Sequence, residues 1–127
     1  MRLRFVASIL VTLSTTALAQ AAPFDGKWTG TMLGKGGWEQ GVEVVIAQAV
    51  GTWRFTPRGT QGRNSPCLGK EFPIAVTSQS DVALEFAVKG ASVLAGCIDQ
   101  AAILKAPSAS VLEGMLEDGR SLRLSRQ

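Results

Sequence analysis

The sequence contains two cysteines, Cys67 and Cys97, which are its clearest candidates for metal binding, redox chemistry or a disulfide. A thiol pair can bind a metal, exchange electrons or form a structural disulfide, and the first two uses favour a Cys-x-x-Cys spacing that is absent from this sequence. We therefore predict a structural disulfide. Closing a loop of about 30 residues stabilises a fold by about 3–4 kcal/mol on the chain-entropy model.

Paired carboxylates are the other candidates for chemistry. Glu39 and Glu43 fall on one face of a predicted strand, as do Glu113 and Glu117, whereas a glycosidase needs two carboxyl groups across a sugar-binding cleft. The chain has no His, which excludes Ser-His-Asp and Cys-His mechanisms and a His-based zinc site. We predict solvated carboxylates, a turn role for Asp99, and a protein that is not an enzyme and uses neither metal nor cofactor.

The candidate binding residues surround one long irregular stretch, residues 57–71. Prolines and glycines interrupt this stretch, which is also basic, and long loops often carry function. A tryptophan beside the glycine-rich turn at 34–37 suits either the cap or the mouth of a barrel. The residues predicted to bind a ligand or partner are Trp38, Arg54, Arg58, Arg63 and Lys70.

The first 22 residues predict where the chain goes. Arg2 and Arg4 precede an apolar run over residues 5–13, and small-x-small sites follow at residues 17–21. This order is typical of a cleaved secretory signal peptide, and we favour it over a membrane anchor. We therefore expect a bacterial periplasmic or secreted protein, with no stable membrane insertion after cleavage. An oxidising compartment also favours the disulfide.

Charge does not indicate a polyanionic partner. The formal net charge of the whole chain is +3, and the two leader arginines supply two of those charges. Because the remaining chain is nearly neutral, nucleic acid and an anionic membrane surface are not predicted as partners. We therefore predict that the binding partner is a small apolar ligand or a protein.

Period-two alternation dominates residues 23–127, which we predict to form one exported domain. Turn signals recur along the chain, including an Asp-Gly hairpin turn at residues 118–119. We predict an all-β fold, a small antiparallel up-and-down barrel of about eight strands, with a β-sandwich as the alternative. The predicted strands cover residues 24–32, 38–48, 53–55, 72–76, 82–88, 94–98, 101–105, 111–116 and 121–125.

The opening strand carries a family resemblance. Its sequence, Phe24-Asp25-Gly26-Lys27-Trp28, resembles the first strand of calycin-type barrels, the lipocalins and avidin-like proteins, which open with Gly-x-Trp. The resemblance implies an up-and-down barrel with a central pocket for a small ligand. It also implies that the tryptophan lies at the closed base of that barrel.

Two functions are compatible with these features. The first is a binding module for a small apolar or amphipathic ligand, with Trp38 and the loop at residues 57–71 forming the mouth. The alternative is a protein-interaction module, an inhibitor or an envelope-assembly partner, whose contact surface is the same basic loop. An apolar interior cavity favours the first, whereas a fully packed interior favours the second.

Overall fold

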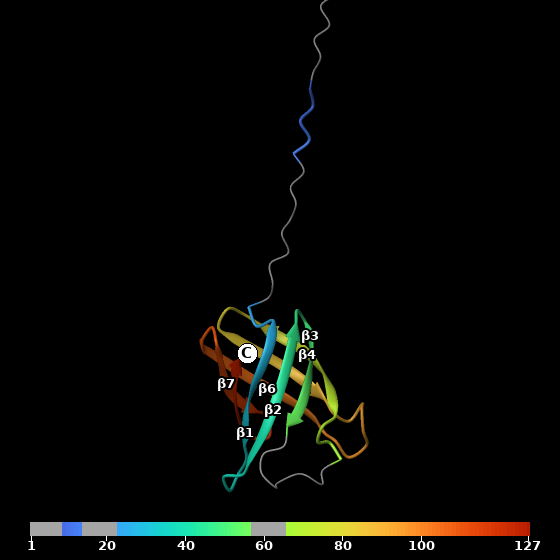
Figure 1. Cartoon of the computed structure of the whole chain (residues 1–127), viewed down its shortest axis with the longest axis vertical. Coiled ribbons are helices and arrows are strands. Elements are labelled where there is room, and N and C mark those ends of the chain that lie inside the picture. Colours follow the sequence, from blue (N-terminus) through green and yellow to red (C-terminus); the bar gives the residue numbers. More distant parts are fainter. Residues whose placement is uncertain (1–8, 14–22, 57–65) are drawn as a thin grey trace, which may run out of the picture.

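The computed structural model describes residues 9–13, 23–56 and 66–127, and within these ranges eight antiparallel strands close into a barrel (Figure 1). Each strand pairs with its neighbours in sequence, and β8 returns to pair with β1, which confirms the barrel and excludes the sandwich. The strands are β1 (Gly26–Leu33), β2 (Glu39–Ala47), β3 (Val50–Thr56), β4 (Glu71–Gln79), β5 (Ala83–Lys89), β6 (Asp99–Ser108), β7 (Val111–Leu116) and β8 (Ser121–Arg126).

The barrel interior is filled by one face of each strand. Successive side chains of a strand point to opposite faces, so alternate apolar residues enter the core while their neighbours face solvent. Val42, Val44 and Ile46 of β2 are fully buried, in the phase that the sequence predicts. The leucines of the final hairpin also share the interior, as predicted: Leu112, Leu116, Leu122 and Leu124.

Several predicted boundaries are wrong. The strand predicted at residues 53–55 begins already at Val50, as β3. Residues 94–98 form a turn instead of a strand, because Gly96 has a positive φ of 92° and the amide of Cys97 bonds back to the carbonyl of Leu94. Strand β4 runs on to Gln79, which moves the polar turn to residues 80–82. Strand β6 continues through Pro107, where an irregular register accommodates a residue without an N–H.

Gly30 allows β1 and β8 to approach closely. A Cβ at this position would overlap the carbonyl oxygen of Arg123 on β8, so only glycine fits without a backbone shift. Gly114 stands in the same relation to the carbonyl of Ile103 on β6. These close approaches bring neighbouring strands together at two points of the closed wall.

One end of the barrel is closed by residues from both ends of the domain. Trp28 is fully buried there, and its indole nitrogen donates to the carbonyl of Phe24 at 3.0 Å. The guanidinium of Arg126 lies 4.3 Å from the centre of the Trp28 ring. It also donates to the carbonyls of Pro23 at 2.7 Å, Asp25 at 2.6 Å and Ala109 at 3.1 Å. This cluster is the base of the barrel.

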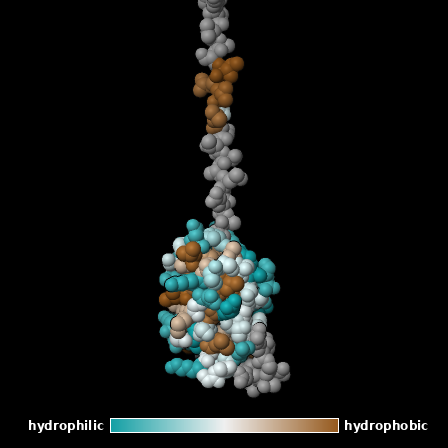
Figure 2. Space-filling view, turned by 90° about the vertical axis from the view of Figure 1, so that its left-hand side faces the viewer, coloured by the Kyte–Doolittle hydropathy of each residue, from teal (hydrophilic) through white to brown (hydrophobic). Residues whose placement is uncertain are grey.

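Of the predicted leader, residues 9–13 are described and the rest of residues 1–22 lies outside the described part. The described piece is apolar and stands clear of the barrel (Figure 2), and its large side chains are at least 75% exposed. No helix in the described ranges is long and apolar enough to cross a membrane.

Candidate functional site

The end of the barrel opposite the base carries four connections. In an up-and-down barrel every second connection falls at the same end, so the links after β1, β3, β5 and β7 meet there (Figure 1). The residues concerned are the turn at 34–38, the described part of the long loop at 66–70, the turn at 90–98 and the hairpin at 117–120. We call this end the mouth.

A cavity of about 360 Å³ opens at the mouth. This volume lies in the lower part of the range of small-molecule sites in proteins. The lining is mostly apolar, with a few polar groups, as such sites commonly are. Its principal apolar side chains are Met32, Trp38, Phe55, Leu68, Phe72 and Val88, and its polar or charged side chains include Gln40, Gln100, Asp118 and Arg120.

Two aromatic rings, Phe55 and Phe72, line one wall of the cavity, and further rings support them from the core. Phe55 meets Phe72 edge to face at 6.2 Å between ring centres and meets Trp53 at 5.7 Å. Trp53 in turn packs against Phe86 at 6.1 Å and is fully buried. Because these contacts fix the rings from several sides, the wall is held in place before any ligand arrives.

Trp38 is positioned by the turn between β1 and β2. The amide of Gly34 donates to the carbonyl of Trp38 at 3.1 Å, and a Cβ on Gly34 would overlap the indole ring. The absence of a side chain at Gly34 therefore leaves the space that the ring occupies. Trp38 is half-buried and packs against the core while lining the cavity.

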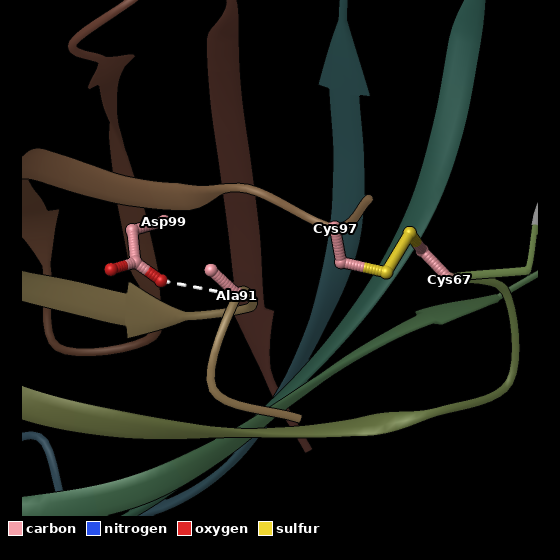
Figure 3. The surroundings of a disulfide bond; sticks show 4 residues. All are labelled: Cys67, Ala91, Cys97 and Asp99. Atoms are coloured by element: carbon pink, nitrogen blue, oxygen red, sulfur yellow. Dashed lines mark hydrogen bonds between the residues drawn. A yellow bond between two sulfur atoms is a disulfide. The ribbon is translucent and has the colours of Figure 1, made fainter. Parts of the chain in front are cut away.

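The disulfide joins two of the mouth connections. Cys67 lies before β4 and Cys97 lies before β6, and their bond confirms the predicted pair (Figure 3). Both cysteines line the cavity. The side chain of Asp99 accepts a hydrogen bond from the amide of Ala91 at 3.1 Å, which braces the same connection and agrees with the predicted turn role.

The polar groups of the lining differ in how they are bonded. The side-chain nitrogen of Gln40 donates to the carbonyl of Thr56 at 2.6 Å. The guanidinium of Arg120 donates from Nε to the carboxylate of Asp118 at 2.7 Å, so these two charges offset each other. Among the described residues, the side-chain oxygen of Gln100 has no hydrogen-bond partner.

The predicted binding residues fall in different places. Trp38 lines the cavity as expected. Arg54 lies exposed on the outer wall, where it pairs with Glu71 at 3.1 Å, and Lys70 is exposed near the mouth. Arg58 and Arg63 lie outside the described residues, so their role stays a prediction.

Sequence reasoning missed Gln40 and Gln100 as site residues. Each occupies an inward position at the mouth end of its strand, where apolar side chains precede or follow it with period two. A polar side chain at an inward position is the signal in the sequence, because burying a polar group is unfavourable unless it forms a hydrogen bond.

The carboxylates of the predicted strand-face pairs, Glu43 and Glu113 among them, lie on the outer wall. Glu43 pairs with Lys27 at 3.4 Å, and Glu113 pairs with Arg123 at 3.1 Å. Such exposed pairs are worth little in stability and fit the predicted solvated face. Within the described ranges, no group of three or more His, Cys, Asp or Glu side chains is arranged to hold a metal ion.

Comparisons with known proteins identify the fold alone. No family model and no curated protein matches the chain. Among solved structures, it is similar to a redesigned β-barrel, with a TM-score of 0.53 and 17% sequence identity. The match covers 83% of this chain and 92% of the redesigned barrel. At this identity the likeness supports the barrel architecture and assigns no activity.

Proposed function

We propose that this protein is a non-catalytic binding module that holds a small apolar or amphipathic ligand in the mouth of its barrel. The observation that carries the proposal is the cavity of about 360 Å³, whose lining combines apolar and polar side chains and includes two aromatic rings that contact each other and both cysteines of the disulfide. A packed β-barrel of eight strands has room for side chains or for one small ligand. The interior below the mouth is filled by side chains, so the ligand would occupy the opening at the mouth and not the central pocket that the barrel resemblance implies.

Export to the periplasm or the medium is part of the same proposal. The leader pattern at residues 1–22 supports it, as do the described residues 9–13, which stand clear of the barrel instead of contributing to its core. A disulfide is also more common in exported proteins than in cytosolic ones. A binding module in such a compartment would meet ligands outside the cytoplasm.

The test is a titration of the purified protein with N-phenyl-1-naphthylamine, a neutral dye whose fluorescence rises in apolar surroundings. We expect saturable binding of one dye per chain. Trp38→Ala should weaken it about tenfold, because removing a ring contact of about 1–1.5 kcal/mol changes affinity by that factor. Val50→Ala is the matched control, since Val50 lies on the outer wall and is 62% exposed.

Either of two results would contradict the ligand-binding proposal. One is a linear fluorescence response that never saturates. The other is an unchanged affinity in a folded Trp38→Ala variant, which would place the dye somewhere other than the mouth.

A protein partner that docks on the loop at residues 57–71 is the second candidate function. It is favoured by Lys70, which is exposed beside the mouth on a connection held by Cys67. Reversing the charges of Arg58, Arg63 and Lys70 should abolish capture of such a partner while leaving the melting temperature and dye affinity unchanged. Capture of the same partner by the charge-reversed protein would rule this function out.

A further inference from the structure

Gln100 places a hydrogen-bond acceptor inside the mouth. It lies at the start of β6, opposite Val88 of β5, and its side chain is among those that line the cavity. The residue is only 9% exposed, and in the described part of the chain its Oε1 atom accepts no hydrogen bond. A buried acceptor without a partner destabilises a fold, so its presence calls for an explanation.

Two other polar side chains of the described lining, Gln40 and Arg120, already bond elsewhere. The amide nitrogen of Gln40 is bonded to the carbonyl of Thr56 at 2.6 Å and to that of Gly41 at 3.3 Å. Arg120 is paired with Asp118. The indole nitrogen of Trp53 is also buried without a partner among the described residues, but Trp53 is not among the side chains that line the cavity. Oε1 of Gln100 is therefore a buried acceptor in the wall of the cavity, and an entering donor would reach it once the side-chain amide turns toward the opening.

We propose, on the basis of the ligand-binding function above, that the ligand is an uncharged amphipathic molecule that donates an O–H or N–H hydrogen bond to Oε1 of Gln100. Its apolar body packs against the ring wall and Met32. Alcohols, phenols, aromatic secondary amines and amides meet this requirement.

A carboxylate head group does not meet it. An ionised carboxylate has no proton to give to Oε1, and it would lose its hydration on entering the mouth. The charges of the described lining do not compensate that loss, because Arg120 is already neutralised by Asp118. The acceptor therefore selects against fatty acids and for neutral donors of similar size.

The test compares two dyes that differ by one donor, N-phenyl-1-naphthylamine and its N-methyl derivative. The unmodified protein should bind the N–H dye about tenfold more tightly, the effect of one buried hydrogen bond. In Gln100→Met, which keeps the length of the side chain, the two dyes should bind within about twofold of each other. Gln79→Met is the matched control and should keep the preference, because Gln79 is exposed at the base end of β4, away from the cavity.

The outcomes distinguish failure of the hydrogen-bond donor proposal from failure of the ligand-binding function. Equal affinities for the two dyes in the unmodified protein, or a preference that persists in Gln100→Met, would overturn the donor proposal and leave ligand binding intact. Failure of both dyes to bind the unmodified protein would overturn the ligand-binding function and this inference with it.

A stability measurement checks the premise without any ligand. Gln100→Met should raise the melting temperature of the free protein by a few degrees, because it removes a buried acceptor that lacks a partner among the described residues. A lower melting temperature would show that the amide is already satisfied in the free protein, and this result would overturn the proposal.

Discussion

Replacing both Cys67 and Cys97 with serine is expected to lower the free energy of unfolding by about 3–4 kcal/mol. The disulfide closes a loop with a sequence separation of 30 residues, and removing it frees the unfolded chain more than the folded one. The loss should appear as a lower urea midpoint with a steeper slope, because the unfolded chain without the bridge is less compact and exposes more surface. Reduction of the unmodified protein should produce the same shift, which serves as the matched control.

The same double variant should also bind N-phenyl-1-naphthylamine more weakly at temperatures where it is folded. Both cysteines line the cavity, and their bond ties the segment before β4 to the connection before β6. Without the disulfide, a bound ligand would have to order these two segments, and the conformational entropy lost in doing so would reduce the affinity. A serine variant as stable as the unmodified protein would contradict the role assigned to the bridge.

Arg126→Met is expected to lower the free energy of unfolding by about 3 kcal/mol, because it removes about three partly exposed charged hydrogen bonds and one cation–π contact. The guanidinium holds the carbonyls of Pro23, Asp25 and Ala109 and covers Trp28, so it ties β8 to the entry of the chain and to the turn before β7. Methionine keeps the apolar stem of the side chain and loses all of these bonds.

Arg123→Met is the matched control for this prediction. Arg123 lies on the same strand, but its side chain is 67% exposed and its ion pair with Glu113 is on the outer wall. The expected cost is below about 0.5 kcal/mol. Equal losses in the two variants, measured by urea unfolding, would contradict the account of the base. Dye affinity at the mouth should be unchanged in both.

Much of the fold could be predicted from the sequence because burial in a barrel follows a simple period. Alternation placed Val42, Val44 and Ile46 on one face, and the structure confirms that this face is the core. The disulfide could be predicted from cysteine number and spacing. The strand proposed at residues 94–98 was wrong because apolar residues there pack over the mouth, while Gly96 and the bond at Cys97 impose a turn.

The site was harder to predict because closure of the barrel creates it. Gln100 reaches the mouth only after β6 pairs with β5. Arg126 and Trp28 are in contact in the folded barrel although almost the whole domain separates them in sequence. Charge was a poor guide, since Arg54 is satisfied by Glu71 on the outer wall. The informative polar residues were uncharged amides at inward positions, Gln40 and Gln100.

A nuclear magnetic resonance titration of ¹⁵N-labelled protein with N-phenyl-1-naphthylamine tests most directly whether the mouth of the barrel binds a ligand. A ligand in the mouth should produce shifts that saturate at one equivalent and that gather on the mouth ends of the strands, at Met32, Phe55 and Gln100. The amides of Trp28 and Arg126 at the base should not move. Shifts confined to the outer wall, or no shifts at all, would contradict a ligand site inside the mouth.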